Sequence, residues 1–113
     1  MEAVLAKGLV ASGSGCEGVV RVAGDVAAVL ALLDDPHLGE TILLTESATA
    51  TAVVPLLPRI RGLICTSGGT TSHLAIVARE FGLPCVMAAE VGDAALLDGV
   101  RVVVAGDGTV ARA

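Results

Sequence analysis

The sequence GGTTSHLAIVAREFGLP occupies residues 68–84 and decides the fold more than any other stretch of the chain. Two glycines and three hydroxyl residues precede His73, and an apolar helical pattern follows it. Ser72 or Thr71 is a typical N-cap residue, so we expect a helix from there through Phe81, with a glycine just past its end. Backbone N–H groups at a helix start lack intrahelical partners and favour negative charge. The pattern therefore predicts a histidine at the N-terminus of a helix, where the free N–H groups would stabilise a bound phosphate.

The side chains of this helix can be placed by angle, at about 100° per residue. The apolar stripe that we expect to face a sheet consists of Leu74, Val77, Ala78 and Phe81. Ala75 and Ile76 fall outside the stripe, on the side that we expect to be exposed, and Ile76 lies close to one turn from His73. A small apolar surface there would suit docking onto a partner's active site. The alternative is that a loop covers Ile76, and the exposure of that side chain in the fold decides between the two.

Composition limits the chain to one domain and excludes some classes of function. With 113 residues, we expect a single domain over 1–113 with an adequate core. The chain is 54% hydrophobic, carries a net charge of −5, and has Phe81 as its only aromatic residue. A nucleic-acid partner is not expected, because such proteins present basic patches and usually stacking side chains.

Neither a membrane nor a disulfide framework is expected. No apolar run approaches the length of about 20 residues that spans a bilayer, and the first three residues lack the basic region of a secretory signal. Cys16, Cys65 and Cys85 are odd in number and far apart. This spacing argues against structural zinc and favours a reducing cytoplasm, with the cysteines as small core residues.

Around the histidine segment, short β-like runs alternate with helix-like runs. We expect strands at residues 9–12, 19–22, 41–45, 62–65, 85–88, 100–105 and 109–111. We expect a helix capped by Asp25 and ending at Leu33, a helical turn over residues 55–60, and a short helix over residues 91–97. Strands and helices mixed in this way indicate an α/β or α+β sandwich.

The segment GGTTSHLAIVAR at residues 68–79 closely resembles the signature of the mobile, phosphohistidine domain of PEP-utilising enzymes. That family includes pyruvate phosphate dikinase, PEP synthase, enzyme I of the sugar phosphotransferase system, and rifampin phosphotransferase. GLPCV at residues 82–86 matches the continuation of the signature, and ASGSG at 11–15 and GDGTV at 106–110 resemble the opening and closing segments. The resemblance implies an α/β (α+β) fold, the three-layer β/β/α swivelling phosphohistidine domain.

The resemblance implies that His73 is the phosphoryl acceptor, and a neutral imidazole is a competent nucleophile near pH 7. The alternative for His73 is a capping or solvent-facing side chain. Gly68 and Gly69 form a phosphate cradle in this interpretation, although a turn alone would also require them. Thr71 and Ser72 are either helix caps or hydroxyl donors to the phosphate.

Three further positions bear on the resemblance. Cys65 stands where the family commonly has threonine, and Thr70 stands where several members have arginine. Arg79 matches an arginine of the family motif, but its helical angle points away from His73. We therefore expect Arg79 to form a structural ion pair and to take no part in catalysis.

Phosphoryl transfer requires charge neutralisation, usually by metal ions and several cationic side chains. The chain has one lysine and no nucleotide-binding motif, so we expect it to bind no cofactor and to be inactive alone. The resemblance then implies a free-standing swivelling subunit of a split, PEP-synthase-like phosphotransferase. His73 would carry the phosphoryl group from ATP or PEP to an acceptor, with Mg²⁺ bound on ATP-grasp or PEP- and substrate-binding partner subunits. The alternative is a stand-alone phosphocarrier or regulatory phosphohistidine protein that acts by binding.

Overall fold

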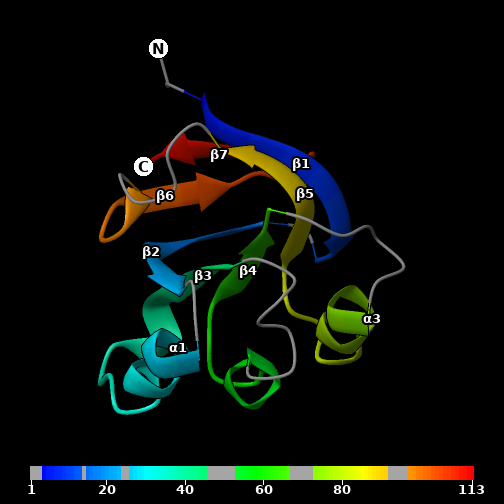
Figure 1. The fold of residues 1–113 in the computed structure, drawn as a ribbon. Coiled ribbons are helices and arrows are strands. Elements are labelled where there is room, and N and C mark those ends of the chain that lie inside the picture. Colours follow the sequence, from blue (N-terminus) through cyan, green and yellow to red (C-terminus); the bar gives the residue numbers. More distant parts are fainter. Residues whose placement is uncertain (1–3, 14, 24–25, 46–52, 67–72, 92–96) are drawn as a thin grey trace.

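The computed structural model describes residues 4–13, 15–23, 26–45, 53–66, 73–91 and 97–113, with the backbone alone for Ser12, Val26 and His73. Its strands close into a barrel in the order β1-β5-β4-β3-β2-β6-β7 (Figure 1). The strands are β1 (Val4–Ser12), β2 (Cys16–Ala23), β3 (Thr41–Thr45), β4 (Gly62–Cys65), β5 (Cys85–Val91), β6 (Arg101–Val104) and β7 (Thr109–Arg112). The helices are α1 (Val26–Leu32), α3 (His73–Glu80) and the 3-10 turns η1 (Leu38–Glu40) and η3 (Val54–Leu56).

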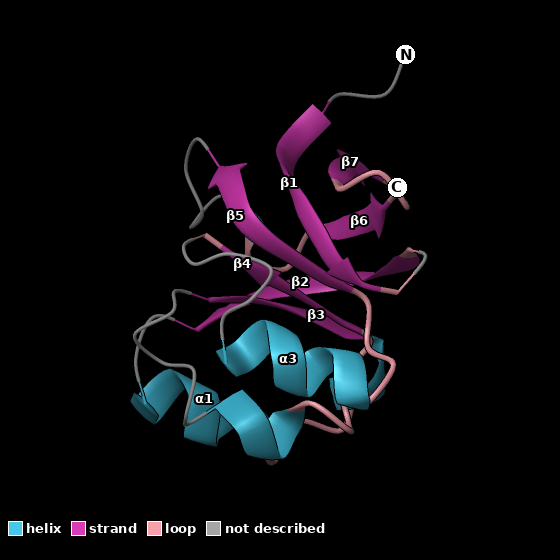
Figure 2. Cartoon of the chain, turned by 90° about the vertical axis from the view of Figure 1, so that its right-hand side faces the viewer, coloured by secondary structure: helices cyan, strands magenta, loops and turns pink. Residues whose placement is uncertain are grey.

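Half of the barrel is a parallel sheet. The pairs β2–β3, β3–β4 and β4–β5 are parallel, whereas β1 and β7 pair antiparallel with their neighbours. Every residue of β3 and β4 is buried, as expected for parallel strands covered on both faces. Helices α1 and α3 connect successive parallel strands and lie on the same side of the sheet (Figure 2).

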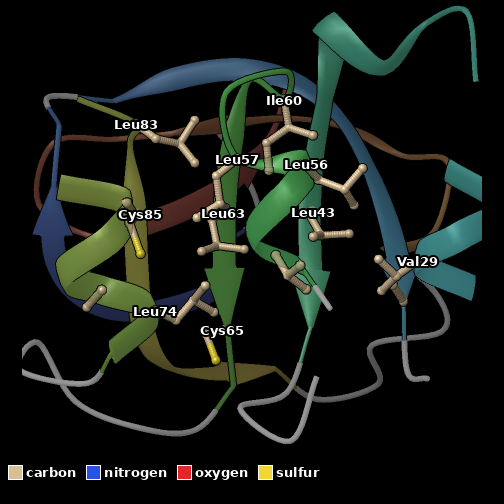
Figure 3. Close-up of a cluster of buried hydrophobic side chains, with 14 of the residues drawn as sticks. Val29, Leu43, Leu56, Leu57, Ile60, Leu63, Cys65, Leu74, Leu83 and Cys85 are labelled. Carbon is tan, nitrogen blue, oxygen red and sulfur yellow. The ribbon is translucent and has the colours of Figure 1, made fainter. Parts of the chain in front are cut away.

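Alternate side chains along the central strands enter two separate cores. Leu43 and Leu63 point to the helix side, where they pack with Leu74 of α3 (Figure 3). Ile42 and Ile64 point to the other face and fill the barrel interior. This alternation follows from the two-residue period of a strand. The parallel sheet is therefore the shared wall between the barrel interior and the helix layer.

The mixed α/β class expected from the sequence is confirmed, and β3 and β4 have the expected bounds. Strands β1, β2 and β5 are longer than expected. The prediction of a helix that starts at Val91 is wrong at that residue, because Val91 ends β5 and pairs with Ala6 of β1. Residues 92–96 of the predicted helix lie outside the described part of the chain. In the described part of the chain the strands close into a barrel, and α1 and α3 lie on one side of it.

The described surface carries several large exposed apolar side chains. They are Val4, Leu9, Val10, Leu30, Ile76 and Phe81. None of the helices in the described ranges has the length and apolar character needed to cross a membrane.

Candidate functional site

The carboxyl ends of the parallel strands form one edge of the sheet. Here the Thr45 hydroxyl donates a hydrogen bond to the Ala23 carbonyl oxygen over 3.0 Å, and the Thr66 N–H donates to the Thr45 carbonyl oxygen over 3.0 Å. The chain leaves β4 at this edge and, after residues 67–72, enters α3 at His73. In α/β sheets, ligands bind at the carboxyl ends of the strands. His73 thus begins a helix at the edge where a reacting group is expected.

The first turns of α3 are held against the sheet by buried side chains. Leu74 is 2% exposed, and Ala75 and Ala78 are fully buried. Leu74 lies beside Cys65, the last residue of β4, and this contact brings the helix start to the strand end (Figure 3). Because Leu74 follows His73 directly and is packed in the core, it restricts the movement of the backbone at His73.

The end of α3 is a Schellman motif. The Gly82 N–H donates to the Arg79 carbonyl oxygen over 3.1 Å, and the Leu83 N–H donates to the Ala78 carbonyl oxygen over 3.0 Å. Gly82 has a φ of 66°, the left-handed conformation expected for a glycine just past a helix. Leu83 is buried against the helix-side core. The expected stop at Gly82 is confirmed.

The buried face of α3 differs from the stripe expected from sequence. Ala75, expected to be exposed, is fully buried, so it offers no surface for docking. Phe81, expected to face the sheet, is 52% exposed, because the helix ends at Glu80 and Leu83 occupies the buried position. Ile76 is 43% exposed. Docking through Ile76 requires that its side chain be exposed, and it is; the docking itself stays a prediction.

The proposed phosphate cradle cannot be compared with the structure. Gly68, Gly69, Thr71 and Ser72 lie outside the described residues. His73 is the first residue of α3, at the helix start expected from the capping pattern.

Burial disfavours the reactive thiolate form at Cys85, and also at Cys16, which is partly buried. Burial, together with the neighbouring Cys65, raises the pKa of the Cys85 thiol to about 12, although Arg79 opposes the rise. Burial also raises the pKa of Cys16, against a lowering effect of Arg61. A protonated thiol reacts slowly because the thiolate is the nucleophile. Cys65 and Cys85 lie in the helix-side core, as expected for small core residues.

Arg79 contacts the barrel through a bond that sequence reasoning missed. Its Nε donates to the carbonyl oxygen of Ala11 in β1 over 3.1 Å. The ion pair expected for Arg79 from the sequence stays a prediction. No local signal marks Ala11, whose carbonyl becomes a partner only when β1 folds beside α3. The side chain of the second histidine, His37, is 80% exposed and lies 3.9 Å from Glu40.

Comparison with known proteins decides the family. Residues 38–108 match the family described as PEP-utilising enzyme, mobile domain. The chain belongs to this family. A probable phosphoenolpyruvate synthase of Methanothermobacter thermautotrophicus is 37% identical over 84 residues, which cover 74% of this chain. The rifampicin phosphotransferase of Bacillus subtilis is 36% identical over 80 residues, which cover 71% of this chain.

A solved structure also resembles the chain. The N-terminal domain of "Enzyme 1 - Nitrogen" superimposes with a TM-score of 0.54 at 31% identity, covering 74% of this chain and 37% of that one. The matched stretch spans only 11% of the phosphoenolpyruvate synthase and 9% of the rifampicin phosphotransferase. The similarity therefore concerns one mobile domain and leaves most of each relative unmatched.

Proposed function

We propose that this chain is a phosphohistidine swivelling domain that carries a phosphoryl group on His73. The observation that carries the proposal is the place of His73: it is the first residue of α3, at the carboxyl edge of the parallel strands. Family membership supports the same role, because its relatives include a phosphoenolpyruvate synthase and a phosphotransferase. In this proposal the barrel and its one-sided helices serve as the β/β/α swivelling unit.

In this proposal the phosphoryl group is transferred twice, first to His73 and then to an acceptor. A lone pair on an imidazole nitrogen of His73 attacks the phosphorus of ATP or PEP, and the bond from phosphorus to the leaving oxygen breaks, with its electron pair going to that oxygen. The ring loses its other N–H proton to solvent. An acceptor hydroxyl oxygen then attacks the phosphorus and loses its proton to solvent; the N–P bond breaks with its electron pair going to that ring nitrogen, and the other ring nitrogen takes a proton from solvent, which restores the neutral imidazole. Histidine suits both steps, because its ordinary pKa of about 6.5 leaves most of the imidazole neutral at pH 7.

Donor and acceptor sites are proposed to lie on partner subunits of a split, PEP-synthase-like phosphotransferase. An ATP-grasp or PEP-binding partner would hold the donor and Mg²⁺, since phosphoryl transfer depends on metal ions and cations around the phosphates. The second candidate is a stand-alone phosphocarrier or regulatory phosphohistidine protein that acts by binding, which the exposed Ile76 beside the helix start favours.

The proposal is tested by labelling the chain with ³²P-labelled PEP or ATP, in the presence of ATP-grasp and PEP-binding proteins from the same organism. We expect a phosphate that is lost in acid and kept in alkali, the behaviour of a phosphoramidate bond. The chain has two histidines, so His37→Ala is a matched control. His73→Ala should abolish labelling and substrate turnover, and His37→Ala should keep both.

The outcomes separate the candidates. Labelling with turnover by a partner supports the carrier, and labelling without turnover favours the binding or regulatory protein. A chain that takes no label from either donor refutes both.

A further inference from the structure

Strand β1 carries a bulge beside the last turn of α3. Val10 pairs with Val86 and Ser12 pairs with Cys85, so two steps along β1 match one step along β5. Ala11 is the extra residue, and the extra residue of a bulge is left out of the regular ladder. Its side chain is buried in the helix-side core. Backbone groups in such a place need partners from outside the ladder.

Arg79 supplies one of these partners. Its Nε donates to the Ala11 carbonyl oxygen over 3.1 Å, in a partly buried setting. The guanidinium also lies near the start of β5, where its charge lowers the pKa of the Cys85 thiol, although burial and Cys65 outweigh this effect. The bond to Ala11 thus connects α3 to β1, one of the two strands that the helix packs against.

The connection acts at the end of α3 opposite His73. A helix of eight residues is about 12 Å long, so a tilt of about 5° at one end moves the other end by about 1 Å. A misplacement of about 1 Å at a reacting group can slow a reaction by about 100-fold. A bond that limits the tilt of α3 therefore bears on how well His73 meets a donor or acceptor.

We propose that Arg79 is a positioning residue, whose bond to the Ala11 bulge fixes α3 against β1 and thereby holds His73 in place for phosphoryl transfer. The proposal rests on the proposed function of His73, because only a reacting histidine needs a fixed position. It also gives the motif arginine a role that needs no contact with the phosphate.

Three variants separate the hydrogen bond from the packing of the side chain. Arg79→Met keeps an aliphatic stem and removes the donor, whereas Arg79→Lys keeps a donor at the end of the chain. Arg59→Met removes an exposed arginine outside α3 and serves as the control. Two quantities are measured in each variant: amide hydrogen exchange in α3 compared with β3 and β4, and the initial rate of His73 phosphorylation by the donor that labels the wild type.

We expect Arg79→Met to speed exchange in α3 by about 10-fold without changing β3 and β4, and to lower the initial labelling rate by about 10- to 100-fold. The final stoichiometry should be unchanged, and Arg79→Lys should restore most of the rate. Wild-type labelling rates in Arg79→Met, or an equal loss of protection in α3, β3 and β4, would overturn the inference. A wild-type chain that takes no label refutes the function of His73 itself, and the exchange data then still show whether Arg79 braces α3.

Discussion

Gly8 and Gly108 close the barrel by bringing β1 against the turn before β7. The Gly8 N–H donates to the Gly108 carbonyl oxygen over 3.1 Å, and a Cβ added at Gly108 would collide with the Gly8 carbonyl oxygen. Gly108 also has a φ of 92°, which L side chains rarely adopt. β1 can approach this turn so closely only because Gly108 lacks a side chain; a Cβ at Gly8 would instead collide with Met87 and Val86 of β5.

Gly108→Ala should therefore lower the free energy of unfolding by about 2–4 kcal/mol, combining backbone strain with steric overlap. Gly39→Ala is the matched control, because Gly39 is exposed and a Cβ there meets nothing within 4 Å. Urea denaturation measures both. Equal stability of the two variants would contradict this account of barrel closure.

Gly82→Ala isolates the conformational cost at the end of α3. A Cβ at Gly82 meets nothing within 4 Å, so only its φ of 66° opposes the substitution. We expect a loss of about 1–2 kcal/mol in the free energy of unfolding, and a smaller loss for Gly82→Asn, because asparagine tolerates this conformation. The same urea titration measures both variants. A Gly82→Ala protein as stable as wild type would show that the Schellman turn does not need glycine.

Cys85 should make stability depend on pH in the alkaline range. Its pKa in the folded chain is raised from 9.0 to about 12 by burial, chiefly, and by Cys65. As the pH rises, the thiol of the unfolded chain loses its proton before the thiol of the folded chain. The contribution of Cys85 to the free energy of unfolding is therefore fully present below pH 9 and is lost as the pH rises toward 12. From pH 8 to pH 10 we expect Cys85 to account for a fall of about 1 kcal/mol in the free energy of unfolding.

Urea denaturation under reducing conditions at both pH values tests this. The chain has no tyrosine and one lysine, so few other groups titrate there. Cys85→Ala should show a smaller fall between pH 8 and pH 10 than wild type. An identical fall in the two proteins would rule out the titration of Cys85 as its cause.

Ile76 is expected to act in docking. Because its side chain is 43% exposed, Ile76→Ser should change the free energy of unfolding by less than about 1 kcal/mol. It should lower the rate of partner-dependent phosphorylation by about 10-fold while leaving phosphorylation by phosphoramidate, a small donor that needs no docking, unchanged. Leu30→Ser is the control, since Leu30 is 56% exposed on α1. Wild-type rates in Ile76→Ser would exclude a docking role.

The local parts of the fold could be predicted from the sequence, and the long-range parts could not. Strands β3 and β4 are short apolar runs, so their bounds follow from composition. Closure of the barrel depends on pairings such as Ala6 with both Val91 and Val110, between residues far apart in the chain. The first half of β1 was missed because Lys7 and Gly8 interrupt its apolar pattern.

The candidate site shows the same division. Capping residues and the apolar pattern were enough to place His73 at the start of a helix. Helical angles alone gave the wrong exposure for Ala75 and Phe81, because packing against β1 and β5 and the turn at Gly82 decide which face is covered. The bond from Arg79 to Ala11 depends on a bulge in a distant strand, which no local pattern predicts.

The central claim is that His73 carries the phosphoryl group, and locating the phosphate by mass spectrometry after labelling at neutral pH tests it most directly. Fragmentation that preserves the N–P bond distinguishes His73 from the hydroxyl residues Thr70, Thr71 and Ser72 just before it. The account predicts one acid-labile phosphate on His73 and none in His73→Ala. An acid-stable phosphate on one of those hydroxyls, or labelling that persists in His73→Ala, would contradict it.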